Sequence, residues 1–244
     1  MIKNVKVYGL EDSIKASKYP MSVDVDNCTS EITEKVKSLA MCEKGTGHDN
    51  FLNGIIVQFD LTFSNKAWIE IERYHFMDFV SSQSTMHCIS KMDIEKQCNE
   101  YVLPQTIFHS KMLKEIYLKD PTPENYLNLL YNTPSGFMLT ARMTTNYRQL
   151  KTIYSQRKYH KLPEWREFCK WIETLPYSEL ITSTKQKAKW LKTDDEICYS
   201  EKCSACGWQG RVCTEFCDRA TKKYCPNCGA EMEVSNGKTN QTNS

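Results

Sequence analysis

A segment of alternating side chains, residues 57–63, constrains the fold more than any other part of the chain. Its apolar members are Val57, Phe59, Leu61 and Phe63, and Gln58, Asp60 and Thr62 lie between them. A period of two residues predicts a strand with one buried face. Ser64 or Asn65 can then cap a helix with an apolar stripe at Trp68, Ile71 and residues 75–79. The hydroxyl, amide and imidazole groups of residues 81–87 predict a polar loop that can line a ligand site.

Residues 74–84 carry a spaced motif. Tyr74-His75-Phe76, seven further residues and then Ser84 resemble the R-H-R-x7-S signature of the flavin-dependent thymidylate synthases. The histidine and the serine match, whereas Tyr74 and Phe76 replace both arginines. The Asn-Glu pair of that signature falls on Ser81 and Ser82, and its following Arg-Tyr on Met86 and His87. Upstream, Gly47-His48-x-x-x-Leu52 is similar to the lead-in of the same family.

A second patch follows in the order and at the spacing of that family. The stretch Asn146-Tyr147-Arg148-Gln149-Leu150 resembles its N-x-R-x-L, and Arg157 lies nine residues after Arg148. Residues 162–167 are similar to its A-Q-W-E, with about one residue inserted. The resemblance covers about residues 1 to 180.

The second patch also predicts a helix on its own terms. Residues 147–159 contain no Gly or Pro, and Asn146 is a good N-cap. Arg157 would share a face with Leu150, Ile153 and Tyr154, whereas Arg148 would lie roughly 180° away. A buried arginine needs an acceptor, so a salt bridge to a carboxylate at the core edge is one interpretation of Arg157. Plain solvent exposure is the alternative for Arg148.

The resemblance implies a reaction and a set of residues. The family methylates dUMP reductively, with FAD, NADPH and methylenetetrahydrofolate, at sites between the subunits of a homotetramer. The resemblance implies catalytic roles for Ser84, which would orient the substrate, and for Arg157, which would donate a hydrogen bond toward the pyrimidine. The residues that would bind the cofactor are His48, His75, Asn146 and Arg148. His75 could instead be a core or interface residue, and His48 could cap its loop. Lys91 or Arg73 could replace a lost cation.

The C-terminal cysteines predict a metal site. Cys203, Cys206, Cys225 and Cys228 form C-x2-C-x18-C-x2-C, the spacing of a four-thiolate zinc site, and Gly207 and Gly229 follow the two pairs. A closed set of four sulfurs predicts a structural zinc, which a ribbon of about 40 residues needs for stability. Cys213 and Cys217 are alternative ligands or free thiols.

Composition and pattern predict an α+β protein, with a flavin-dependent thymidylate synthase-like domain followed by a small zinc-ribbon domain. The predicted boundaries are a main domain over 1–184, a linker over 185–197, a ribbon over 198–234 and a disordered tail over 235–244. The net charge of +2 gives no case for binding nucleic acid by bulk electrostatics. No stretch has the roughly 18 apolar residues of a membrane span, and no signal peptide is evident. We therefore expect a cytoplasmic protein with reduced cysteines.

The remaining elements complete the α+β pattern. Strands are expected over 4–8 and 137–144. Helices are expected over 33–41, 93–101, 105–118 and 164–173, and one more begins at Pro123 with Thr122 as its cap. Three functions remain open: a flavin enzyme acting on dUMP or a related pyrimidine nucleotide, a catalytically silent paralogue, and a nucleic-acid-binding protein. The last would use ribbon residues, namely Trp208, Arg211, Arg219, Lys222 and Lys223.

Overall fold

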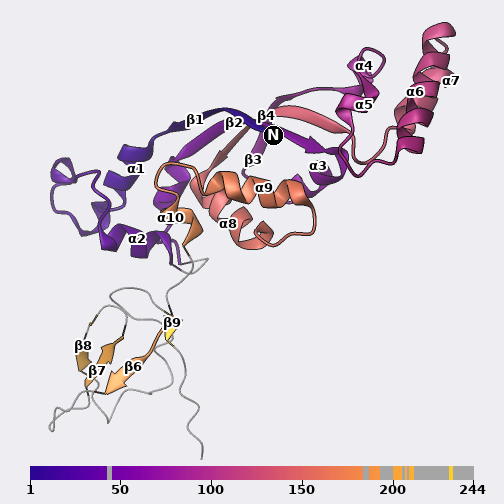
Figure 1. Ribbon diagram of the computed structural model, residues 1–244. Coiled ribbons are helices and arrows are strands. Elements are labelled where there is room, and N and C mark those ends of the chain that lie inside the picture. Colours follow the sequence, from indigo (N-terminus) through magenta and orange to yellow (C-terminus); the bar gives the residue numbers. More distant parts are fainter. Residues whose placement is uncertain are drawn as a thin grey trace, which may run out of the picture. The chain divides into compact units, whose positions relative to one another are not determined.

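The chain divides into two compact units. A computed structural model describes residues 1–42, 46–183, 187–192, 200–204, 207, 209–211 and 231–232. The first unit comprises Met1–Ser13 with Asn50–Thr182, and the second comprises Ile14–Asp49 with Ser183–Ser244. Figure 1 shows both units and labels the α-helices and all strands except β5. Among the described residues, no helix is both long and apolar enough to cross a membrane.

A four-stranded antiparallel sheet organises the first unit. Its order is β1 (Ile2–Tyr8), β2 (Ile56–Ser64), β4 (Met138–Asn146) and β3 (Met77–Ser82). The strands expected over 4–8 and 57–63 are confirmed as parts of β1 and β2, and the one expected over 137–144 is confirmed from Met138 onward as part of β4. All four apolar side chains of residues 57–63 are fully buried, so the period of two identified the core face of the sheet.

Two helices cover that core face. Helix α8 (Tyr147–Arg157) begins at the Asn146 cap, whose Oδ1 accepts the Gln149 N–H at 2.8 Å. Helix α9 (Pro163–Ile172) has the strongest apolar stripe of the unit, and Figure 1 shows it beside α8 on one side of the sheet. Its rings Trp165 and Phe168 lie 5.1 and 5.8 Å from those of Phe63 and Phe59. These ring contacts pack α9 against the core face of the sheet.

The helix after β2 is shorter than the sequence indicated. Helix α3 (Asn65–Ile71) is capped by Ser64 as expected, but it ends at Ile71. Residues 77–82 form β3 and pair with β4, and residues 85–88 form the short helix α4 (Thr85–Cys88). The expected helical stripe over 75–79 is therefore wrong, and the loop expected over 81–87 is reduced to residues 83–84. Pairing with β4 satisfies backbone groups that the helix would have used, and this outweighs local periodicity.

A small helical lobe lies between β3 and β4 in the sequence. It contains α4, α5 (Ile94–Gln97), α6 (Pro104–Lys119) and α7 (Pro123–Tyr131). Its own core contains Ile89, Ile94, Leu129 and Phe137. The expected helices over 105–118 and from Pro123 are confirmed, but the one over 93–101 is reduced to α5, because Cys98 leaves the helix to bridge Phe137. The short helix α10 (Glu179–Thr182) follows α9.

The described part of the second unit is mostly short elements. Its helical segments are η1 (Tyr19–Met21), η2 (Val25–Asn27) and α2 (Glu34–Ala40), and α2 confirms the helix expected over 33–41. Helix α1 (Leu10–Ala16) spans the boundary between the units, and η3 (Asn50–Gly54) begins the return to the first.

Two small sheets follow residue 186. Strand β5 (Lys187–Ala188) pairs in parallel with β9 (Glu231–Met232). The other sheet is antiparallel, with β6 (Trp190–Lys192), β7 (Ser200–Cys203) and β8 (Gln209–Arg211). Strands β5 and β6 fall within the linker expected over 185–197. The expected tail over 235–244 lies outside the described residues.

Candidate functional site

The two motif segments, which are far apart in the sequence, contact each other in the first unit. The triplet, residues 74–76, lies between the end of α3 and the start of β3. Arg157, the last residue of α8, donates from Nε to the Tyr74 phenol oxygen at 2.7 Å. Directly before Asn146, where the second patch begins, the Thr145 hydroxyl donates to the Phe76 carbonyl oxygen at 2.6 Å. The fold therefore joins the triplet to both ends of the second patch.

Arg157 is held as a buried ion pair. Only 7% of the residue is exposed, and its Nη1 lies 2.7 Å from Glu70 Oε2. The guanidinium also lies over the Trp165 ring, 4.7 Å from the ring centroid. Burial without a carboxylate partner would cost several kcal/mol, so Glu70 is what permits this placement. The salt-bridge interpretation of Arg157 is confirmed, and its role toward a pyrimidine stays a prediction.

His160, which is half-buried, completes this cluster. Its Nε2 lies 2.7 Å from Arg157 Nη1 and 3.3 Å from Glu70 Oε2. Desolvation lowers the pKa of the His160 imidazole, while the Glu70 carboxylate opposes that shift. A neutral ring can accept the Arg157 N–H, whereas an imidazolium would face a guanidinium. Sequence reasoning missed Glu70 and His160. The available signal was His160 itself, three residues beyond Arg157.

Ser84 lies at the other end of β3 from the triplet. It occupies the N-cap position of α4, but its side chain makes no capping hydrogen bond. The preceding Gln83 is fixed against β4, because its N–H donates to Thr140 O and its Oε1 accepts the Thr140 N–H, each at 2.9 Å. A six-residue strand spans roughly 20 Å, so Ser84 and Arg157 are not brought together within one chain.

The four residues expected to bind the cofactor have different surroundings. His75 is exposed, which excludes a place in the core of this chain. Asn146 is buried and uses its side chain to cap α8. Arg148 is half-buried, so it is not the fully exposed residue that the alternative suggested. His48 is an exposed turn residue of the second unit. Their binding roles stay predictions.

The metal-site residues are described only in part. Cys203 ends β7 and is buried, with 1% exposed. Gly207 has a φ of 72° and donates its N–H to the Cys203 carbonyl at 2.9 Å. This turn needs the left-handed backbone that glycine supplies. Cys206, Cys225 and Cys228 lie outside the described residues, as do Cys213 and Cys217. Within the described ranges, no three metal-ligating side chains cluster.

Polar side chains form a network on the sheet face opposite α8 and α9. Arg142 of β4 donates from Nη1 to Asp60 Oδ1 at 3.1 Å and to the Asn4 carbonyl at 2.7 Å. The Asn4 amide donates to Asp60 Oδ2 at 2.5 Å. Hydrogen bonds from Asn4 and from Arg142 lower the pKa of the Asp60 carboxyl. The alternating pattern had placed Asp60 and Arg142 on the polar face, but nothing in it indicated this contact.

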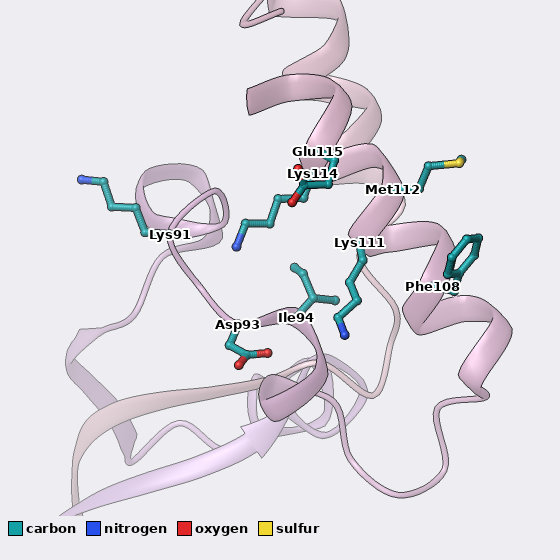
Figure 2. Close-up of a pocket in the computed structure, with 8 residues that line it drawn as sticks. All are labelled: Lys91, Asp93, Ile94, Phe108, Lys111, Met112, Lys114 and Glu115. Atoms are coloured by element: carbon teal, nitrogen blue, oxygen red, sulfur yellow. The ribbon is translucent and has the colours of Figure 1, made fainter. Parts of the chain in front are cut away.

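A cavity of about 620 Å³ lies in the helical lobe, between the α4–α5 connection and α6 (Figure 2). Its lining residues are Lys91, Asp93, Ile94, Phe108, Lys111, Met112, Lys114 and Glu115. Lys111 forms an ion pair with Glu95, and Lys114 Nζ donates to the Met92 carbonyl at 2.6 Å. In Figure 2 the Phe108 ring and the Met112 side chain extend away from the lysines. None of the motif residues lines this cavity.

Solved structures share the fold of this chain. Two crystal structures of the flavin-dependent thymidylate synthase ThyX from Helicobacter pylori, each with FAD and dUMP, match it with TM-scores of 0.58 and 0.59. The fold is that of ThyX. The identities are 14% and 15%, and each match covers 74% of this chain and 97% of the ThyX chain. No family model and no curated protein matches the sequence. The expected ThyX-like α+β domain is thus confirmed at the level of fold.

Proposed function

We propose that this chain is a ThyX-like enzyme that acts on a pyrimidine nucleotide, with reductive methylation of dUMP as its reaction. The fold carries this proposal, because it spans 97% of ThyX chains that hold FAD and dUMP. The contact between Tyr74 and Arg157 supports it, since it joins two segments that resemble the motifs of that family.

Flavin, reductant and folate would supply the chemistry. When bound, FAD would supply the redox chemistry, with NADPH as the reductant and methylenetetrahydrofolate as the source of the carbon. The protein would position the nucleotide and polarise its uracil, with the Ser84 hydroxyl as the orienting group. Ser84 is suited to this task, because it is half-buried and its hydroxyl is not used to cap α4.

The triplet does not fit the pyrophosphate of a flavin dinucleotide. Tyr74 is buried and engaged by Arg157, and Phe76 presents a phenyl ring that is 60% exposed. Neither side chain carries a charge. Exposed rings and aliphatic groups at Phe76, Phe79 and Val80 suit an apolar ring system better than phosphate. We therefore expect FAD to bind more weakly here than in typical members of the family, and no catalytic step is assigned to the triplet.

The separation of Ser84 and Arg157 supports an assembly with shared sites. A nucleotide cannot contact both ends of a strand of roughly 20 Å from one chain. Two chains could supply the two residues to one pocket. This fits the homotetramer that the family resemblance implies, with Arg148 and Arg157 on opposite sides of α8 serving different pockets.

A catalytically silent paralogue is the second candidate, and the state of Arg157 favours it. Its Nη1 and Nε are engaged by Glu70, His160 and Tyr74. Within the described residues, Nη2 is the guanidinium nitrogen of Arg157 that makes no such contact and could reach a ligand. If Arg157 serves the core alone, the fold persists without chemistry.

We also propose a structural zinc in the C-terminal ribbon, held by Cys203, Cys206, Cys225 and Cys228. The buried Cys203 and the left-handed Gly207 turn that follows it support the proposal. Of the ribbon residues expected to contact nucleic acid, the structure describes the backbone of Arg211 alone, on β8. That interaction stays a prediction.

Flavin absorbance and turnover test the proposed function together. The full chain is purified, FAD is added, and retained flavin is measured after gel filtration. Formation of dTMP from dUMP, NADPH and methylenetetrahydrofolate is then followed by chromatography. Product formation supports the enzyme. Binding of dUMP without product favours the silent paralogue, and absence of both flavin and dUMP binding overturns the proposal.

A further inference from the structure

One row of the sheet connects Arg142 to the segment that leads to Ser84. Across the four strands, Lys3, Asp60, Arg142 and Ser81 are successive cross-strand partners. Partners in antiparallel strands point to the same face. Ala141 and Met143, on either side of Arg142, are buried in the core, so this row belongs to the opposite, polar face. Three residues beyond Ser81 along the chain comes Ser84.

The partners of Arg142 orient its guanidinium but use only part of its hydrogen-bond donors. Asp60 and the Asn4 carbonyl both take hydrogen bonds from Nη1. A guanidinium carries five N–H donors in a rigid fork, so those of Nε and Nη2 remain, and within the described residues no acceptor meets them. The side chains of Arg142 and Asp60 are 25% and 27% exposed, so solvent or a ligand can reach this pair.

The backbone conformation of Asn4 directs its polar groups toward Arg142 and Asp60. Its φ is 53°, and it lies in the bulge where the β1 register shifts between Lys3 and Lys6. A bulge re-aims the residues it contains, and here the carbonyl and the amide of Asn4 converge on Arg142 and Asp60. The fork is therefore pre-organised before any ligand arrives.

The surroundings favour an anion. By register, the same face receives the cations Lys3, Lys6 and Arg142 and the carboxylates Asp60 and Asp78. Cations exceed carboxylates by one. The remaining donors of Arg142 match the paired oxygens of a phosphate, which guanidinium groups bind in bidentate geometry.

We propose that Arg142 binds the phosphate of the pyrimidine nucleotide, in place of the cation that is lost where Met86 replaces the arginine after Ser84. The inference rests on the proposed function and names a specificity residue for it. Of the two substitutes that the sequence offered, Lys91 lines the lobe cavity and Arg73 is an exposed residue just after α3. Arg142 alone of these three is the cross-strand partner of a residue in the 81–84 segment.

Paired titrations test the assignment. Binding of dUMP and of deoxyuridine to the full chain, with FAD added, is measured by calorimetry for wild type, Arg142→Gln and Arg142→Lys. We expect Arg142→Gln to weaken dUMP binding by about ten- to a hundredfold and to leave deoxyuridine binding within about twofold. Arg142→Lys should recover part of the loss, because it keeps the charge without the fork. The matched control is Arg73→Gln, which should bind both ligands as wild type does. Thermal unfolding of each variant separates lost binding from lost folding.

The outcomes distinguish this inference from the proposed function. If wild type binds dUMP and Arg142→Gln binds it equally well, the phosphate role is wrong and the proposed function stands. An equal loss in Arg73→Gln would also overturn the role, because it would show a general effect of charge. If wild type binds neither ligand, the proposed function itself fails.

Discussion

The Tyr74 phenol oxygen lies 2.7 Å from Arg157 Nε, so the first position of the triplet supports the arginine that ends α8. The same hydroxyl lies 3.1 Å from Gln156 Oε1, to which it donates. Tyr74 thus has a structural task at a position where the resembled signature has an arginine. An arginine at this position would put a second cation beside the buried Arg157, whereas the uncharged phenol accepts its Nε–H.

Replacing Tyr74 by Phe should destabilise the first unit. The substitution leaves the buried Arg157 Nε–H without its acceptor, which costs about 1 to 3 kcal/mol in the free energy of unfolding. Urea denaturation measures the change. Tyr159→Phe is the control, since Tyr159 is 89% exposed, and it should change stability by no more than about 0.5 kcal/mol. Equal stability of the two variants would show that the Tyr74 contact is dispensable.

Removal of the Glu70 carboxylate should have a larger effect. Glu70→Ala leaves a buried guanidinium unpaired, and breaking such a pair costs about 3 to 5 kcal/mol. Glu72→Ala, at the exposed residue that directly follows α3, controls for the lost carboxylate. Thermal unfolding followed by far-ultraviolet circular dichroism compares the two. A Glu70→Ala midpoint equal to that of Glu72→Ala would mean that Arg157 finds another acceptor.

Stability should fall as the pH drops below about 6.5, the ordinary pKa of histidine. Burial holds the pKa of the His160 imidazole below that value in the folded chain, so the unfolded chain binds the proton more readily. The stabilisation from neutral His160 is therefore present above the unfolded pKa and is lost as the pH falls toward the folded one. Arg157, Arg166 and Arg73 oppose protonation, whereas Glu70 favours it.

Denaturation midpoints at pH 7.5 and pH 5.5 measure this effect. The lowered pKa values of Asp60 and Asp93 act below the ordinary aspartate value of 3.8, outside this window. His160→Gln should therefore reduce the difference between the two midpoints. An unchanged difference would assign the pH dependence to other groups.

Local patterns predicted the elements whose signals agree with their tertiary roles. The alternation from Val57 to Phe63 identified the core strand, and the Asn146 cap identified the start of α8. The helix prediction for residues 77–79 failed because the edge strand β3, with Phe79 and Val80 exposed, has little periodicity of its own. Pairing with β4 determines its conformation. The site was predictable where motifs resemble a family. The partners of Arg157 and Arg142 were not, since Glu70 and Asn4 reach them from 87 and 138 residues away.

Purified chain should contain one zinc ion, because the four predicted thiolates close one tetrahedral site. Elemental analysis of protein prepared without chelator gives the content. Cys203→Ser should abolish zinc binding and unfold the ribbon, while most helix signal from the first unit is kept. Cys169→Ser, at a buried cysteine of α9 whose pKa is raised by burial to about 12, should keep the zinc. A preparation with no zinc would contradict the proposed site.

Mixing two inactive variants should restore activity if pockets are shared between subunits. Ser84→Ala removes the hydroxyl at one end of β3, and Arg157→Lys removes the guanidinium at the other while keeping a charge near Glu70. In randomly mixed oligomers, a pocket that takes Ser84 from one chain and Arg157 from another is intact in roughly a quarter of cases. We therefore expect about that share of wild-type dTMP formation after co-refolding, against almost none for either variant alone. Light scattering checks that the mixture assembles as a tetramer. An inactive mixture of correctly assembled tetramers would mean that Ser84 and Arg157 do not contribute to one shared pocket.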